Sequence, residues 1–438
     1  MFAENNNSKF MNLFDENGHM KIYEGMRFYK KTEEQNNMVR LWLKLKETVN
    51  EDSLSYAAVK TMERHRTFRL VVKNDGKCYY LEDNQREPVV HKNDSSRYVV
   101  GTADNNGHLT RIGYGEDTIT IDFFHGTSDG IGVYNFARTL LYFYFKHLGK
   151  ITEEVSNVVT EATLEDSREY ADCFLFVEPQ KVNATKKYEY ERAFQLPDKR
   201  MDCPYECNYS KIKVNALEFE SFMRSNGSSR SGVFAYFINT AIAKVNPDFA
   251  DPVVCALAVN ARGAYGAEIT NRCCVATVPV WYDHEIQNLP LGEALKKSRL
   301  MIVDGATKDN VTAAALGNIK FNQSLEERFS TLAEKRAFAC EVNKRGGVKY
   351  TYGLSYVGEF SVCPEIDKYI EEVHTVLCAN TIPLIVEITK FAGYYNLSYC
   401  SHFENDLYMD EFLNELKKSG ISYTVEKVDN FKEPLAVF

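Results

Sequence analysis

The sequence predicts an α/β protein built from two lobes. Its 438 residues are more than one hydrophobic core usually supports, so we expect two domains. Both halves contain strand-like runs, such as 38–45 and 210–214, and amphipathic helical runs, such as 51–66 and 231–245. Because strands and helices follow one another in a similar order in both halves, without repetition of the sequence, we expect two similar lobes with mixed sheets and a cleft between them.

Composition excludes several classes of partner. Apolar residues make up 44% of the chain and charged residues 26%, as in ordinary globular proteins. The net charge of −9 argues against nucleic acid and anionic membranes as partners, and the longest apolar runs are too short to span a bilayer. The polar start, residues 1–10, lacks a secretory signal, and the eleven cysteines are an odd number. We therefore expect a cytoplasmic protein with free thiols.

Changes in composition along the chain suggest where its domains begin and end. Residues 1–20 are polar and are expected to be flexible, and 21–180 form the expected N-terminal lobe. The stretch 150–207 combines charge clusters with three prolines, and we expect a helix or two there. Within it, 181–207 is the expected crossover linker, followed by the C-terminal lobe, 208–438.

The segment 118–130 contains the strongest candidate for a catalytic group. Residues 118–121 alternate as in a strand, so His125 follows at the strand end, with Asp129 four residues on and Gly130 behind it. A histidine held by a strand end can face a cleft, and its ordinary pKa near 6.5 leaves it mostly neutral at pH 7, as a general base requires. A turn with an incidental histidine explains the same residues, because Asp-Gly is a common turn pair.

The cysteines and histidines do not have the spacing of metal ligands. Cys203 and Cys207 lie four apart, and Cys273 and Cys274 are adjacent, but neither pair is accompanied by a second pair. Buried, chemically inert cysteines are therefore favoured over a zinc site, and we expect no bound metal.

His125, Asp129 and Gly130 together form the pattern H-x-x-x-D-G between a strand and a helix. With this pattern the sequence resembles the superfamily of thioester-dependent acyltransferases. That superfamily includes the condensation domains of peptide synthetases, alcohol O-acetyltransferases, wax ester synthases and chloramphenicol acetyltransferase. The resemblance covers the chain from about residue 26 to its end and implies two chloramphenicol-acetyltransferase-like lobes with a tunnel between them. Weaker matches follow in the family's order at 64–69, 259–262, 270–279 and 354–358.

Two departures bear on the acceptor. Condensation domains usually carry two adjacent histidines, and here the first is Phe124. This change favours the O-acyltransferases, yet the D-F-G-W-G segment of the plant alcohol acyltransferases is also missing. The class of acceptor, alcohol or amine, therefore stays open.

The resemblance also implies roles for five residues. His125 removes a proton from a hydroxyl or amine acceptor as it attacks a CoA-type thioester, with acetyl the favoured acyl group. Asp129 pairs with Arg262 and holds the loop. The N–H of Gly130 and the hydroxyl of Ser355 face the developing oxyanion. Acyl-CoA is then a co-substrate, and no cofactor is tightly bound. An ordinary strand-end arginine and a structural strand serine remain alternatives for Arg262 and Ser355.

Two other functions remain open. A condensation-type enzyme would take its acyl group from a carrier-protein thioester, and the carrier would be a separate protein because the chain has no carrier serine motif. A catalytically inactive relative would use the same fold to bind a partner. The intact set of His125, Asp129 and Gly130 argues against inactivity.

Overall fold

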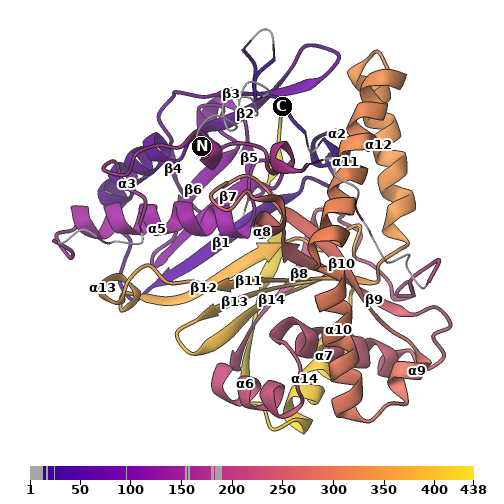
Figure 1. Ribbon diagram of the computed structural model, residues 1–438. Coiled ribbons are helices and arrows are strands. Elements are labelled where there is room, and N and C mark those ends of the chain that lie inside the picture. The colour runs from indigo at the N-terminus through magenta and orange to yellow at the C-terminus, as the bar shows by residue number, and fades with distance from the viewer. Residues whose placement is uncertain are drawn as a thin grey trace, which may run out of the picture.

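The computed structural model in Figure 1 has two lobes, each built around its own β-sheet. Of the helices in the part of the chain that it describes, none is long and apolar enough to cross a membrane. It describes residues 13–15, 18–23, 25–94, 96–152, 155, 158–178, 182 and 190–438.

The first lobe contains a five-stranded sheet whose strands follow the order β12-β1-β7-β6-β4. Leu41 and Leu43 point from β1 into a core that α3 (Glu51–Arg64) and α5 (Gly130–His147) close. This packing follows from the alternation seen in the sequence, which puts every second side chain of β1 on one face. The strands are β1 (Met38–Leu45), β4 (Val90–Lys92), β6 (Thr110–Tyr114), β7 (Thr118–Phe124) and β12 (Ile370–Leu377).

The second half of the chain also contributes to the first lobe. β12 pairs with β1 in antiparallel register, with Val39 opposite Leu377, and it lies against two strands of the second sheet. At the end of the chain, β16 (Leu435–Ala436) pairs with β5 (Val99–Val100), and the ring of Phe438 packs on Phe124. Figure 1 shows the C-terminus at the first lobe. The segment 208–438 therefore joins the lobes at two places that the sequence did not predict.

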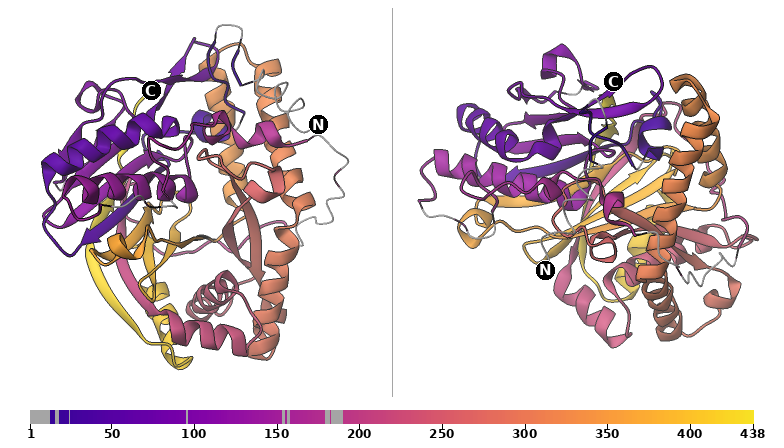
Figure 2. Two further views of the ribbon diagram at one scale, coloured as in Figure 1. Left: turned by 60° about the vertical axis from the view of Figure 1, so that its left-hand side comes forward. Right: turned by 45° about the horizontal axis from the view of Figure 1, so that its top comes forward.

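The second lobe contains a seven-stranded sheet in the order β10-β9-β11-β13-β14-β8-β15. Helices α7 (Arg230–Val245), α10 (Leu291–Gly305) and α14 (Leu407–Lys418) lie on its side away from the first lobe (Figures 1 and 2). Its strands are β8 (Glu206–Asn215), β9 (Val253–Asn260), β10 (Val275–Tyr282), β11 (Tyr352–Glu359), β13 (Leu384–Phe391), β14 (Tyr394–Ser401) and β15 (Tyr423–Lys432).

A helical hairpin from the second lobe reaches back to the first. It consists of α11 (Lys308–Arg328) and α12 (Leu332–Gly347), which stand side by side at the right of Figure 1. The N–H of Leu332 donates to the carbonyl of Gly76, which lies between β2 (Leu70–Asn74) and β3 (Tyr79–Asp83). The remaining helices are α2 (Met26–Tyr29), α4 (Arg66–Arg69), α6 (Ala216–Ser225), α8 (Arg262–Tyr265), α9 (His284–Gln287), α13 (Pro364–Asp367) and the 3₁₀ turn η1 (Ala103–Asn105).

The structure bears on two irregular segments, and it corrects the expectation for the second. In the expected flexible N-terminus, Leu13 and Met20 are buried in the first lobe, while residues 1–12 and 16–17 lie outside the described residues. Within the described part of 150–207, the expected α-helices are absent, and only the 3₁₀ turns η2 (Ser167–Glu169) and η3 (Cys173–Phe176) precede β8. Residues 181 and 183–189 of the expected linker also lie outside the described residues.

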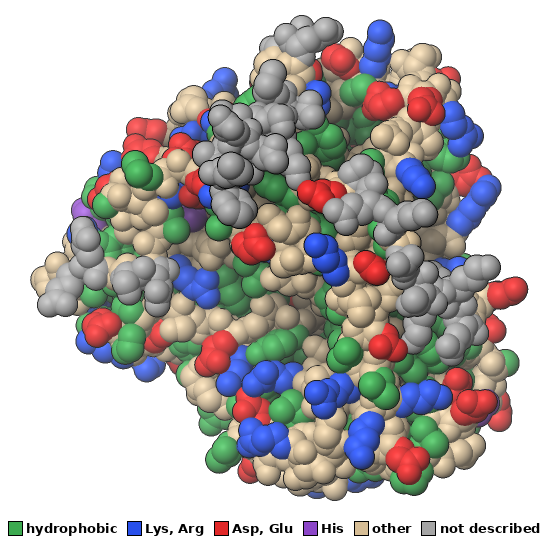
Figure 3. All heavy atoms as spheres, viewed as in Figure 1, with side chains coloured by type: hydrophobic (Ala, Val, Ile, Leu, Met, Phe, Trp, Pro, Cys, Tyr) green, Lys and Arg blue, Asp and Glu red, His purple; other side chains and the backbone are tan. Residues whose placement is uncertain are grey.

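Charged side chains of both signs are interspersed on the face seen in Figure 3. Ion pairs between such exposed side chains add little to the stability of the fold. Buried contacts around the H-x-x-x-D-G segment, such as the pair of Asp129 with Arg262, also hold the lobes together.

Candidate active site

His125 directly follows β7, and backbone carbonyls fix both its position and its proton. Its N–H donates to the carbonyl of Asn37 at 2.8 Å, which prolongs the pairing of β7 with the strand beside it. Its ring Nδ1 lies 2.9 Å from the carbonyl oxygen of Ser128. Because a carbonyl only accepts, Nδ1 must carry the proton, and the lone pair of the neutral ring is on Nε2.

His125 lines a cavity of about 250 Å³ between the two lobes. Residues from α2, β1 and the start of α5 form one side, and residues from β9, β10, β11 and β13 form the other. A cavity between lobes is a common place for a small-molecule site, and both apolar and polar residues line this one. The polar and charged residues that line it are Arg27, Lys30, Gln35, Asn37, His125, Thr277, Ser355, Thr375, Asn380, Glu387 and Glu433.

The surroundings of His125 keep its ring neutral. Burial lowers its pKa to about 4, and the positive charge of Arg27 adds to this effect. The hydrogen bond to Ser128 and the charge of Asp129 oppose it only in part. The ring is therefore in its base form throughout the neutral pH range.

Asp129 points away from the cavity and forms the expected ion pair with Arg262. The guanidinium donates from Nη1 to Oδ2 at 2.9 Å and from Nη2 to Oδ1 at 2.8 Å. The N–H of Cys274 donates to Oδ2 at 2.8 Å, and the N–H of Gly132 donates to Oδ1 at 3.0 Å, so Asp129 is also the N-cap of α5. Burial raises the pKa of Asp129, but these four donors together lower it below its ordinary value.

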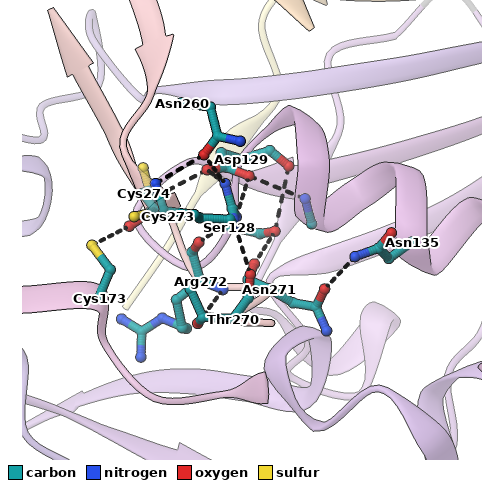
Figure 4. A network of polar contacts seen from close by, with 12 residues as sticks. Ser128, Asp129, Asn135, Cys173, Asn260, Thr270, Asn271, Arg272, Cys273 and Cys274 are labelled. Carbon is teal, nitrogen blue, oxygen red and sulfur yellow. Dashed lines mark hydrogen bonds and ion pairs between the residues drawn. The ribbon is translucent and has the colours of Figure 1, made fainter. Parts of the chain in front are cut away.

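The segment 270–274 of the second lobe braces the same loop (Figure 4). Ser128 donates from its hydroxyl to the carbonyl of Asn271 at 2.7 Å, and Asn135 of α5 donates to the Asn271 side chain at 2.9 Å. Arg262 in turn donates to the carbonyls of Thr270 and Arg272. The loop that aims His125 is therefore held across the interface between the lobes.

Two glycines allow this close approach. Gly130 is the first residue of α5 and lines the cavity, and a Cβ there would meet Cγ1 of Val357 at 2.6 Å. At Gly132, a Cβ would meet the carbonyl oxygen of Asn271 at 2.3 Å. The N–H groups of a first helical turn have no acceptor within the helix. The N–H of Gly130 belongs to this turn, and Gly130 lies at the cavity wall.

Ser355 lies on the opposite wall, and beside it is a carboxyl that the sequence reasoning missed. The strand register sets Ser355 of β11 next to Glu387 of β13. Glu387 is only 8% exposed; burial raises its pKa to about 7, and hydrogen bonding by the Ser355 hydroxyl opposes the rise. A signal was present in the sequence, because Glu387 is the single acidic residue in the apolar strand 384–391.

The structure brings the five predicted residues to one region but divides them between two layers. His125, Gly130 and Ser355 line the cavity, whereas Asp129 and Arg262 lie behind it. In the described part of the chain, no three His, Cys, Asp or Glu side chains are grouped as metal ligands.

Comparison with known proteins identifies the fold but not a close relative. No family model matches the chain, and no curated protein matches it in sequence. Among solved structures, the epimerization domain from the third module of tyrocidine synthetase B aligns at a TM-score of 0.55 with 11% identity, over 92% of this chain and 98% of that one.

Two further structures were solved with coenzyme A or an acyl-CoA. The starter condensation domain of rhizomide synthetase with C8-CoA aligns at a TM-score of 0.60 with 9% identity, over 87% of this chain and 89% of that one. TRI101 of F. sporotrichioides with coenzyme A and T-2 aligns at 0.57 with 12% identity, over 91% and 98%. The chain thus has the two-lobed fold of condensation domains and their relatives, which confirms the predicted fold.

Proposed function

We propose that this protein is an acyltransferase that moves an acyl group from a thioester to a hydroxyl or amine acceptor, with His125 as the general base. The observation that carries the proposal is the hydrogen bond from Nδ1 of His125 to the Ser128 carbonyl. It leaves an unprotonated Nε2 on a half-buried ring that lines a cavity between two lobes. His108 and His284 also bond backbone carbonyls, but neither lines this cavity, so the fixed tautomer supports the proposal only together with the place of His125 on the cavity wall.

The proposed reaction is a direct transfer. Nε2 takes the proton from the acceptor O–H or N–H while that atom attacks the thioester carbonyl carbon. The tetrahedral intermediate then collapses, the C–S bond breaks, and the leaving sulfur takes the proton from His125. The products are an ester or amide and a free thiol, and His125 is neutral again.

Two groups are proposed to stabilise the oxyanion. The N–H of Gly130 lies at the positive end of α5, where a developing negative charge is favoured. The hydroxyl of Ser355 is the second proposed donor, and because it has a single proton it must turn from Glu387 to donate to the oxyanion. Asp129 and Arg262 are proposed as positioning residues, because they hold the loop and do not reach the cavity.

We further propose an acyl-CoA, with acetyl favoured, as the co-substrate, a small molecule as the acceptor, and no tightly bound cofactor. The coenzyme A and C8-CoA in two structures of the same fold support the donor. All eleven cysteines are free thiols, which supports the proposal that the protein works in the cytoplasm. Residues 21–180 and 208–438 are the proposed lobes, with β12 and β16 of the second segment added to the sheets of the first.

A carrier-protein thioester is the second candidate for the donor. The specific observation in its favour is that the fold is that of peptide-synthetase domains. The chemistry at His125 would be the same, because the carbonyl and the leaving sulfur are the same in both donors.

The test is release of free thiol from acetyl-CoA in the presence of a panel of alcohols and amines. His125→Ala and His125→Gln should each reduce the rate by at least about 100-fold, because general-base catalysis is worth about 10²–10⁴-fold. His284→Ala is the matched control, since His284 is exposed on α9 and should leave the rate unchanged. Activity of the His125 variants within a few-fold of the wild type would refute the proposal.

A further inference from the structure

Glu387 points into the cavity from the middle of β13. On this strand, Leu384, Val386 and Ile388 pack into the core of the second lobe, whereas Ile385 and Glu387 line the cavity. The alternation of side chains along a strand accounts for this division.

The carboxyl of Glu387 has few protein partners. Within the described part of the chain it forms no ion pair, and the hydroxyl of Ser355 is the group that stabilises its charged form. A carboxylate can accept about four hydrogen bonds, so most of its capacity faces the cavity. Burial of a charge without a compensating partner is unfavourable, which is why its pKa is raised to about 7.

A second buried carboxyl at the cavity wall provides a comparison. Glu433 is 1% exposed and also lines the cavity, but it accepts hydrogen bonds from the N–H of Asn36 at 3.2 Å and of Met38 at 3.0 Å. Its role is thus to tie the chain end to the start of β1. Glu387 has no such backbone donors in the described residues, so its structural use is not apparent from its contacts.

We infer that Glu387 binds a positively charged, N–H-bearing group of the acceptor, so that the preferred acceptor is an amino alcohol with a protonated amine. An ammonium would supply both the missing charge and the missing hydrogen-bond donor in the same cavity that holds His125. The hydroxyl of the same molecule would then be the group that His125 deprotonates. This inference rests on the proposed acyl transfer.

The test compares two alcohols of nearly the same shape. 2-(Dimethylamino)ethanol is a protonated tertiary amine at pH 8 and cannot form a stable amide, and isoamyl alcohol replaces its nitrogen with carbon. With acetyl-CoA as donor, wild-type kcat/KM should be about 10- to 100-fold higher for the amino alcohol, since a hydrogen bond to a charged group is worth that much. Glu387→Gln should bring the ratio of the two kcat/KM values close to one, chiefly by lowering kcat/KM for the amino alcohol.

Glu433→Gln is the matched control, because its carboxyl faces the same cavity but is occupied by backbone donors. It should keep the wild-type ratio. A wild type without preference for the amino alcohol, or a preference that survives Glu387→Gln, would overturn the inference even where acyl transfer itself is observed.

Direct binding separates the inference from the proposed function. Calorimetric titration of 2-(dimethylamino)ethanol without any thioester should show binding by wild type and His125→Ala, and at least tenfold weaker binding by Glu387→Gln. Such binding without any acyl transfer would uphold the ammonium site and refute the acyltransferase. Equal affinity of wild type and Glu387→Gln would refute the ammonium site alone.

Discussion

Asp129→Ala should both destabilise the protein and inactivate it, because the carboxyl joins the two lobes. Asp129 belongs to the loop of the first lobe, and its partner Arg262 begins α8 in the second. Both side chains are almost fully buried, at 1% and 3% exposure. Truncation therefore leaves a buried guanidinium without its counter-charge.

The size of the effect follows from the contacts that are lost. Breaking a buried ion pair from one side costs about 3–5 kcal/mol, and loss of an N-cap costs about 1 kcal/mol. Arg262 keeps its bonds to the carbonyls of Thr270 and Arg272, which limits the loss to the lower part of that range. We expect a destabilisation of about 3 kcal/mol for Asp129→Ala, and less for Asp129→Asn, which retains an N-cap oxygen.

The assay is urea unfolding monitored by tryptophan fluorescence. The chain has two tryptophans, Trp42 in β1 of the first sheet and Trp281 in β10 of the second. Trp281→Phe and Trp42→Phe backgrounds therefore report the first and the second lobe separately. In wild type the two transitions should coincide, and in Asp129→Ala they should move apart, because one of the buried links between the lobes is broken.

A double-mutant cycle with Arg262→Ala decides the cause. The coupling between the two substitutions should be at least about 2 kcal/mol, as for residues in one ion-pair network. Glu341→Ala is the control, because Glu341 pairs with Arg345 on the surface of α12 and its loss should cost under about 1 kcal/mol. Effects of Asp129→Ala and Arg262→Ala that add within about 0.5 kcal/mol would refute the pair as an energetic link between the lobes.

Two further predictions concern the base and its loop. The rate with isoamyl alcohol should stay level from pH 8 downwards and fall only as the pH approaches about 4. Burial and Arg27 lower the pKa of His125 to about 4, and only the neutral ring accepts a proton. A midpoint of the pH profile near the ordinary pKa of 6.5 would contradict a buried base. Gly132→Ala should lower both the activity and the unfolding midpoint, because its Cβ would lie 2.3 Å from the Asn271 carbonyl oxygen. Gly263→Ala is the control and should change neither, since no atom lies within 4 Å of its Cβ. Equal behaviour of the two variants would show that the loop tolerates the methyl group.

The local features of the site could be predicted from the sequence. A strand that alternates up to Phe123, a histidine at its end and an aspartate before a helix are all set by neighbours in the chain. The pair of Asp129 with Arg262, 133 residues away, came only from the resemblance, because no periodicity links two such distant positions.

Other parts of the structure depend on contacts that a single sequence does not express. β12 resembles the strands of its own half, yet it pairs with β1, and nothing in residues 370–377 specifies that partner. The role of Glu387 was missed for a related reason. Its strand is apolar enough to be assigned to the core. The pairing of Glu387 with Ser355 and its place on the cavity wall become visible only in the structure.

Position and protonation of His125 are controlled by different parts of the fold. The Ser128 carbonyl, three residues from His125, sets the tautomer through a bond within one lobe. The neighbouring hydroxyl of Ser128 binds the Asn271 carbonyl of the other lobe, so the same residue couples the tautomer to the docking of the lobes. Asp129 follows directly and is held by Arg262, so the backbone next to the Ser128 carbonyl is also fixed by a contact between the lobes. The proton on Nδ1 therefore depends on a bond within the first lobe, and the contacts between the lobes support the loop that forms this bond.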